Sequence, residues 1–233
     1  MRFYPRIWMP AALVLATLLA QPPVLAADAT PAAEPSTPPP AAAPPRVRVT
    51  TNMGEFVIEL APERAPLTVA NFLRYVKEGY YSGTIIHRVI ANFVIQGGGH
   101  DATDYKLKSV HEPVVNESGN GMQNKRGAVG LARGDPAHSG NAQFYVNLVD
   151  NSDLDPLPTR WGYAVFGHVV EGMDVIDRIG VTPTGAVGPF KSDAPIKPVV
   201  IQKIALVDAA TPTVTPAPTP AKTTPNTTIE SPR

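Results

Sequence analysis

Short stretches in which apolar and polar residues alternate run through the middle of this chain, and they predict β-strands. The clearest pair covers residues 47–49 and 56–60, where Asn52-Met53-Gly54 supplies the turn of a hairpin. Further short apolar segments predict strands at 85–90, 93–95, 128–132, 143–148, 163–169 and 198–207. The polar segment 100–126 and the segment around residues 187–190 predict long loops.

Two segments have the signals of helices. Pro66 suits a first helical position, the apolar residues from Val69 to Val76 follow at i, i+3, i+4 and i+7, and Gly79 ends the pattern. A second, shorter helix is predicted at residues 173–179. Many short strands with two helices favour a mostly β fold, a closed antiparallel β-barrel capped by the helices.

The two ends of the chain differ from this middle part. Residues 1–26 have a basic start, a short apolar run and small residues before Ala27, which predicts a cleavable secretory signal peptide. The alternative is an uncleaved anchor. Residues 27–45 and 209–233 are rich in Pro, Ala and Thr, so we expect disordered segments that act as tethers or simply as solvated tails. A folded domain is predicted at residues 46–208, in a periplasmic protein.

Composition narrows the chemistry. The chain has 233 residues and no cysteine, which excludes disulfides and thiolate catalysis. Its formal net charge is zero, so nothing favours nucleic acid or an acidic membrane as a partner. The five histidines have no close i, i+4 pairing, and therefore no metal or other cofactor is expected.

Residues 85–98 carry the most informative pattern. Arg88 and Gln96 stand inside two apolar strands, where polar side chains are costly unless they have partners or face a cleft. With Phe93 between them, they predict a small apolar pocket with a guanidinium and an amide at its rim. The alternative is an ordinary buried hairpin with one surface arginine.

This stretch resembles the signature of the cyclophilins, the peptidyl-prolyl cis–trans isomerases. The family has a His-Arg pair, a Phe five residues after the Arg, a Gln three residues after the Phe, and then Gly-Gly. Residues 127–133, 141–145 and 163–169 resemble further family segments in the same order, and residues 187–201 look most like bacterial periplasmic members. The resemblance implies an eight-stranded barrel with a helix over each opening.

The resemblance also implies roles for individual residues. The expected catalytic residues are Arg88, as the donor to the prolyl nitrogen, with Phe93 in the pocket wall and Gln96 on the substrate backbone. The expected substrate-binding residues are Val94, Ala132, Arg133, Gln143, Tyr145, Leu154 and Tyr163. Each of these residues has core packing as its alternative role.

Two positions depart from the family pattern. Tyr145 replaces a phenylalanine at the pocket floor, so its hydroxyl needs a partner. Asp153 stands where many cyclophilins have tryptophan, which implies weak binding of cyclosporin unless Trp161 fills the vacant space. His87 is expected to be a structural, hydrogen-bonding residue behind Arg88.

The predicted function is peptidyl-prolyl cis–trans isomerisation during the folding of exported proteins. The expected partners are proline-containing unfolded polypeptides, and the mature protein is expected to be a monomer without a membrane span. One alternative is a non-catalytic module, a chaperone or scaffold that binds proline peptides in the same groove. A third, weaker alternative is a barrel that binds a small ligand in its interior.

Overall fold

The computed structural model describes residues 43–207; the predicted signal peptide, residues 27–42 of the predicted linker and the predicted tail lie outside these residues. The strands are β1 (Arg46–Thr51), β2 (Gly54–Leu60), β3 (Thr84–Ile90), β4 (Val94–Asp101), β5 (Ala128–Leu131), β6 (Phe144–Asn147), β7 (Val165–Glu171), β8 (Thr184–Val187), β9 (Phe190–Pro195) and β10 (Val199–Val207). The helices are α1 (Pro66–Lys77), α2 (Met173–Gly180) and a single 3-10 turn, η1 (Ser152–Leu154).

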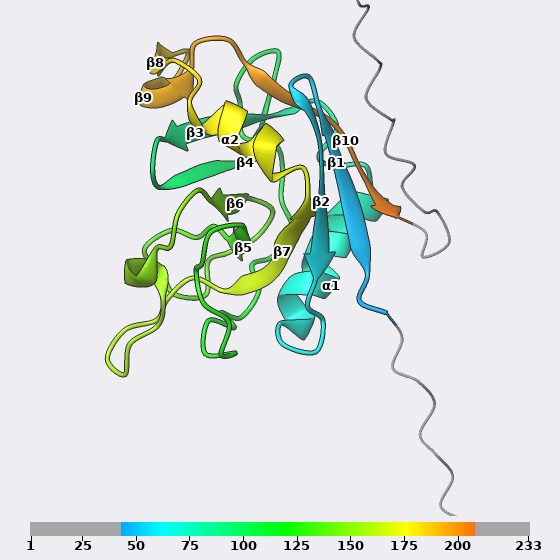
Figure 1. Cartoon of the computed structure of the whole chain (residues 1–233), viewed down its shortest axis with the longest axis vertical. Helices are drawn as coiled ribbons and strands as arrows, with labels where there is room; N and C mark the ends of the chain where they lie inside the picture. The colour runs from blue at the N-terminus through cyan, green and yellow to red at the C-terminus, as the bar shows by residue number, and fades with distance from the viewer. Residues whose placement is uncertain (1–42, 208–233) are drawn as a thin grey trace, which may run out of the picture. The chain divides into compact units, whose positions relative to one another are not determined.

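A closed antiparallel barrel forms the body of the fold, in the order β1-β10-β3-β4-β6-β5-β7-β2 (Figure 1). The barrel and both helices confirm the predicted fold class. Closure pairs the first strand with the last, with Arg46 opposite Val207. Because each of the eight barrel strands has two neighbours, no barrel edge is left open for another chain.

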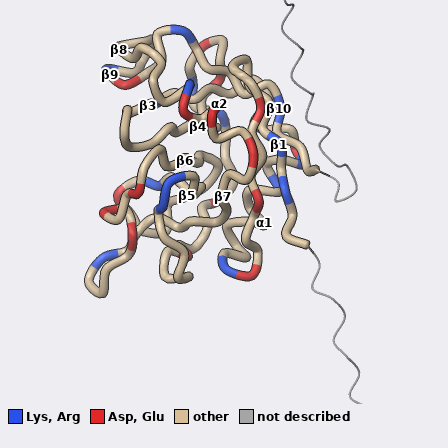
Figure 2. Tube along the Cα trace, viewed as in Figure 1, with Lys and Arg blue, Asp and Glu red and all other residues tan. Residues whose placement is uncertain are grey.

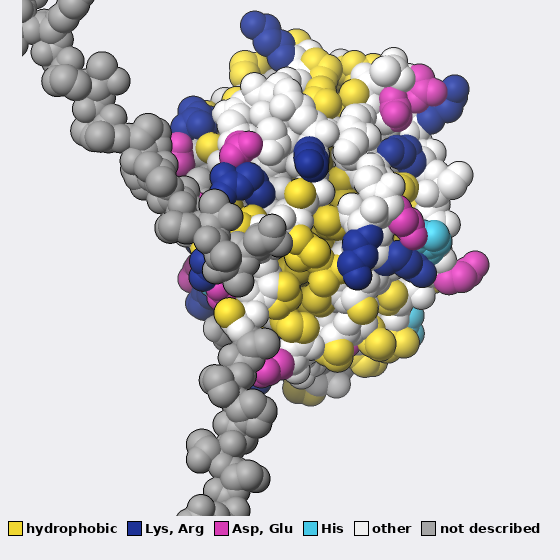
Figure 3. All heavy atoms as spheres, turned by 90° about the vertical axis from the view of Figure 1, so that its right-hand side faces the viewer, with side chains coloured by type: hydrophobic (Ala, Val, Ile, Leu, Met, Phe, Trp, Pro, Cys, Tyr) yellow, Lys and Arg dark blue, Asp and Glu magenta, His cyan; other side chains and the backbone are white. Residues whose placement is uncertain are grey.

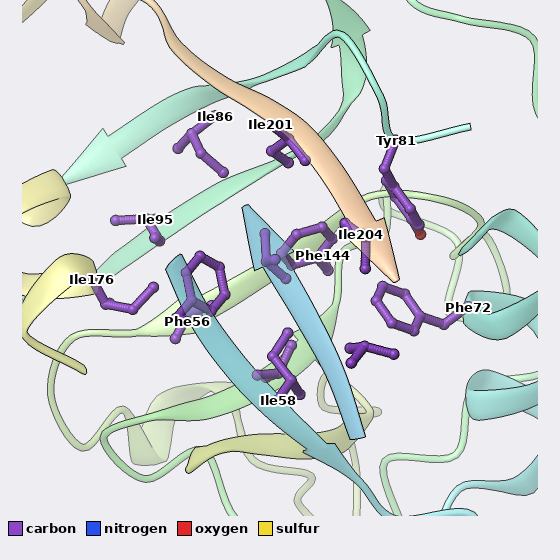
Figure 4. Packing of buried hydrophobic residues seen from close by; sticks show 14 of the residues in the cluster. Phe56, Ile58, Phe72, Tyr81, Ile86, Ile95, Phe144, Ile176, Ile201 and Ile204 are labelled. Carbon is purple, nitrogen blue, oxygen red and sulfur yellow. The ribbon is translucent and has the colours of Figure 1, made fainter. Parts of the chain in front are cut away.

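The core fills the barrel with aliphatic and aromatic side chains. Helix α1 contributes Phe72, which lies close to Phe144 with ring centroids 5.9 Å apart. Helix α2 contributes Ile176, which lies near Phe56 and Ile95 (Figure 4). Both helices therefore bury their apolar faces against one common core, whose side chains pack together inside the barrel.

The structure corrects two of the predicted secondary-structure elements. The segment that ends at Gln96 in the prediction continues as strand β4 through Gly97–Gly99 to Asp101. These glycines do not break the strand because neighbouring elements approach closely: a Cβ on Gly97 would lie 2.6 Å from Ile86. The predicted loop around residues 187–190 is instead a two-stranded hairpin formed by β8 and β9.

Charged side chains are spread over the described surface. Basic and acidic positions are interspersed along the tube (Figure 2), and several of them pair, such as Arg46 with Glu59 and Arg126 with Asp177. One face shows apolar surface with charged side chains around it (Figure 3), as is usual for a folded protein. This distribution gives no single-sign field for capturing a polyanion.

Candidate active site

A hollow of about 230 Å³ lies against strands β3 to β6 and brings the predicted site residues together. Its lining is Arg88, Phe93, Val94, Gln96, Ala132, Arg133, Tyr145, Leu154 and Tyr163. Gln143 is the one predicted site residue outside this lining, and it accepts a hydrogen bond from Gln96. Residues far apart in the sequence meet here because antiparallel pairing places Arg88 opposite Gln96, and Gln96 opposite Tyr145.

Polar side chains form a row along one rim of the pocket. Arg88 donates from Nη1 to Oε1 of Gln96 at 3.2 Å, and Nε2 of Gln96 donates to Oε1 of Gln143 at 3.1 Å. The guanidinium also lies 5.9 Å from the centre of the Phe93 ring. Among the described residues no carboxylate forms an ion pair with Arg88. Most of its five N–H donors are therefore free for a substrate.

The walls of the pocket are apolar. Val94, Ala132 and Tyr145 are buried together, and the partly buried side chains of Phe93, Leu154 and Tyr163 pack against them. The rings of Tyr145 and Tyr163 meet edge to face, with centroids 6.0 Å apart. Such a surface suits a compact apolar ring rather than a charged or extended group.

Tyr145 forms the floor, and two other residues make its position possible. Gly130 on β5 lies so close to the Tyr145 ring that a Cβ there would overlap it. The Tyr145 hydroxyl donates to Oδ1 of Asn124 at 2.6 Å, which is the partner that the sequence showed to be necessary. Burial raises the pKa of this hydroxyl above its ordinary value, so Tyr145 remains a neutral donor at working pH.

Asn124 is a residue of the site that the sequence analysis missed. Its backbone N–H and its Nδ2 both donate to Oδ1 of Asp155 at 2.8 Å, which ties the floor of the pocket to the loop after Leu154. Asn151 belongs to the same network, since its N–H donates to the carbonyl of Asn124 at 2.8 Å, and its Nδ2 donates to the carbonyl of Phe93 at 3.0 Å. The only signal in the sequence was the unpaired Tyr145 hydroxyl, which required a partner but did not say which residue provides it.

His87 lies behind Arg88, but its predicted hydrogen-bonding role is wrong for Nδ1. This atom is buried and has no hydrogen-bond partner within residues 43–207. The ring instead stacks on Phe190 and lies 4.6 Å from the ring of His100. Burial, reinforced by His100 and Arg88, lowers the pKa of His87 to about 3, so the ring is a neutral packing element at working pH.

Trp161 does not fill the space left by the missing tryptophan at position 153. It is absent from the lining of the pocket and meets His138 edge to face at 5.2 Å. Asp153 is exposed on η1 and is also absent from the lining. Among the described residues no three His, Cys, Asp or Glu side chains are grouped as metal ligands.

The barrel, its two helices and the polar row beside an apolar pocket define the class of protein. The sequence model described as "Cyclophilin type peptidyl-prolyl cis-trans isomerase/CLD" matches residues 46–206. The chain therefore belongs to the cyclophilin-type peptidyl-prolyl cis–trans isomerases, as its resemblance to the family implied.

Curated relatives agree with this assignment. The chain is 44% identical over 161 residues to "Peptidyl-prolyl cis-trans isomerase A" of Dickeya dadantii (strain 3937), covering 69% of this chain and 84% of the relative. It is 45% identical over 159 residues to "Peptidyl-prolyl cis-trans isomerase B" of Escherichia coli (strain K12), covering 67% of this chain and 96% of the relative.

Solved structures share the fold. A Cryptosporidium parvum cyclophilin-type isomerase superposes with a TM-score of 0.58 at 23% identity, covering 70% of this chain and 98% of that one. The cyclophilin AquaCyp293 from Hirschia baltica superposes with a TM-score of 0.57 at 24% identity, covering 72% of this chain and 75% of that one.

Proposed function

We propose that the pocket holds the proline of an Xaa-Pro segment and that Arg88 is the catalytic residue. The observation that carries this proposal is the position of Arg88: its guanidinium lies at the rim of an apolar pocket and forms no ion pair with a described carboxylate. A non-catalytic binding module would need the apolar pocket but not this free cationic donor.

The chemistry of the reaction explains why a donor is useful. Rotation about the peptide bond faces a barrier of about 18–20 kcal/mol because resonance gives the C–N bond partial double-bond character. When the bond twists, the prolyl nitrogen regains its lone pair and becomes a better hydrogen-bond acceptor. A guanidinium N–H aimed at this nitrogen therefore binds the transition state more tightly than the ground state, which lowers the barrier.

The remaining site residues hold the substrate. Phe93, Leu154 and Tyr145 surround the proline ring, while Gln96 and Gln143 offer amide groups to the substrate backbone. Because Gln96 accepts from Arg88 and donates to Gln143, its amide orientation is fixed before substrate binds. A rim of this kind reduces the entropy lost on binding and directs Arg88 towards the pocket.

The substrates that we propose are unfolded or partly folded exported polypeptides in the bacterial periplasm. Support comes from residues 1–26, which have the basic start, apolar run and small residues of a signal peptide. Within residues 43–207 no helix has the length and apolarity needed to cross a membrane. The closed barrel has no free edge strand, which supports a monomer.

The test is a prolyl isomerisation assay on Xaa-Pro peptides with the wild-type chain and Arg88→Ala. We expect kcat/KM to fall at least about tenfold, with the unfolding transition nearly unchanged, because Arg88 is partly exposed and not part of the core. Arg178→Ala is the matched control, since Arg178 is an exposed arginine of α2 paired with Asp174. A folded Arg88→Ala variant with wild-type activity would favour the non-catalytic binding module.

A further inference from the structure

A second hollow lies beside the proline pocket and plays no part in the proposed mechanism. It measures about 410 Å³ and is lined by Gly119, Pro156, Leu157, Pro158, Thr159, Arg160 and Trp161. Leu157 is 55% exposed and Trp161 is 49% exposed, so large apolar side chains here face solvent. Exposed apolar side chains grouped around a hollow are more informative than isolated ones, because grouped apolar surface marks binding sites.

One hairpin contributes to the lining of both this hollow and the proline pocket. Residues 154–163 form a hairpin: Tyr163 donates its N–H to the carbonyl of Leu154 at its base, and Leu157 pairs with Arg160 nearer its tip. Leu154 and Tyr163 line the proline pocket, whereas Leu157 and Trp161 line the second hollow. Both surfaces are therefore carried by one short element, seen at the lower left of Figure 1.

Hydrogen bonds hold this hairpin in place although its tip is exposed. Nη2 of Arg160 donates to the carbonyl of Asp153 at 2.8 Å, and Asp155 accepts two bonds from Asn124. On the other side, Nη2 of Arg133 donates to the carbonyl of Trp161 at 3.1 Å, and the guanidinium covers the Tyr163 ring at 4.5 Å. The hairpin that carries the second hollow is thus held partly by Arg133, a residue of the proline pocket.

We propose that the hollow at Leu157 and Trp161 is a second substrate subsite, which binds an apolar side chain of the same client polypeptide whose proline occupies the first pocket. The inference rests on the proposed function, because it needs the proline pocket to be the substrate site. Leu157 is three residues after Leu154, and three residues of chain span at most about 11 Å. The apolar side chain should therefore lie three or four residues from the proline.

Such a subsite would give the enzyme a preference among clients. The proline pocket recognises any Xaa-Pro bond, whereas a second apolar contact favours chains that expose large apolar residues near a proline. Exposed apolar residues are the mark of an unfolded chain, since folding normally buries them. The hairpin would therefore direct activity towards unfolded segments without changing the chemistry at Arg88.

The test compares a short Ala-Pro peptide with nine-residue peptides that carry a single Leu or Ser at each position from four before to four after the proline. We expect Leu at one position three or four residues from proline to raise kcat/KM roughly tenfold over Ser, mostly through KM. Trp161→Ala and Leu157→Ser should remove this preference and leave activity on the short peptide unchanged. Trp161→Phe should retain most of it, which separates loss of an apolar contact from loss of loop structure.

Ile196→Ala is the matched control, because Ile196 is an apolar residue 58% exposed that lines a different hollow. A second measurement uses Trp161 itself. In a Trp8→Phe background Trp161 is the one remaining tryptophan of the chain. Its emission should shift to shorter wavelength with the favoured long peptide and stay unchanged with the short one.

The outcomes are distinguishable. If the short peptide is isomerised but no position shows a Leu preference that depends on Trp161, the subsite is refuted and the proposed function stands. If no peptide is isomerised, the proposed function and the subsite both fail. A Leu preference equal in Trp161→Ala and wild type would place the recognition elsewhere and also overturn the proposal.

Discussion

The substitution Asn124→Ala tests most directly whether the buried amide network supports the active site. Oδ1 of Asn124 accepts from the Tyr145 hydroxyl at 2.6 Å and from Nδ2 of Asn147 at 3.2 Å, while Nδ2 donates to Asp155 at 2.8 Å. Alanine removes all three bonds at once. It leaves the backbone N–H of residue 124 bonded to Asp155.

The expected loss of stability follows from what each partner retains. Tyr145 is 4% exposed, and its hydroxyl has no other partner among the described residues, so leaving it unpaired costs about 1–3 kcal/mol. Asn147 still donates to the carbonyl of Ala128, and Asp155 keeps one bond, so these two losses are smaller. Together they predict a decrease of about 2–4 kcal/mol in the free energy of unfolding.

Tyr145→Phe is the matched variant. It removes the donor without creating a cavity, and Oδ1 of Asn124 still accepts from Asn147. We therefore expect only about 0.5–1.5 kcal/mol of destabilisation. Because the two side chains share one hydrogen bond, the double variant should be less destabilised than the sum of the single variants, by about 1 kcal/mol or more.

Urea unfolding at pH 7 of the wild type, both single variants and the double variant measures these four free energies. Prolyl isomerisation by the same proteins shows whether the pocket floor moves: Asn124→Ala should raise KM more than it lowers kcat, since Arg88 is untouched. Additive losses, or an Asn124→Ala variant as stable as Tyr145→Phe, would refute the view that Asn124 holds the floor.

Three further predictions concern other positions. Asp153→Trp should strengthen cyclosporin inhibition of isomerisation about ten- to a hundredfold over a weakly inhibited wild type, because an indole adds apolar surface and a donor that Asp153 lacks. Tight inhibition of the wild type would contradict this prediction. The pKa of His87 is about 3 in the folded state, against an ordinary value of 6.5, so between these pH values the unfolded state binds more protons than the folded state. The free energy of unfolding therefore falls as the pH falls from 6.5 towards 3. His87→Phe should flatten this part of the pH–stability profile, and an unchanged slope would show that other groups cause it. Exported material should begin near Ala27, and residues 46–208 should retain full activity; N-terminal sequencing that finds Met1, or activity lost on trimming, would argue against these boundaries.

The sequence predicted most of the barrel because periodicity is a local signal. The alternation at residues 47–60 and the helical spacing after Pro66 both match the observed elements. The hairpin of β8 and β9 was missed because its residues are mostly half-buried or exposed and its turn contains Gly188, which resembles a loop. Strand β4 was cut short because glycine usually weakens strands, and close packing against Ile86 overrides that tendency.

The site was predictable to the extent that it follows a spaced motif. Arg88, Phe93 and Gln96 have that spacing, and the structure brings them to one pocket. Asn124 belongs to a segment without periodicity, and its role depends on tertiary contacts with Tyr145 and Asp155 that no local pattern encodes. The position of Trp161 beside His138 likewise depends on the path of an exposed hairpin.

The closure of the barrel has a consequence for how the chain is made. Strand β10 pairs with β1 and also with β3, so the barrel stays open until the last described strand has been synthesised. Pairs such as Arg46 with Val207 join the two ends of the domain, and folds with such distant contacts form slowly. During synthesis the domain therefore cannot close its barrel until its whole length is available. If the chain is exported as we propose, its barrel would still be open while it is being synthesised and would close only after its last strand has followed the first across the membrane.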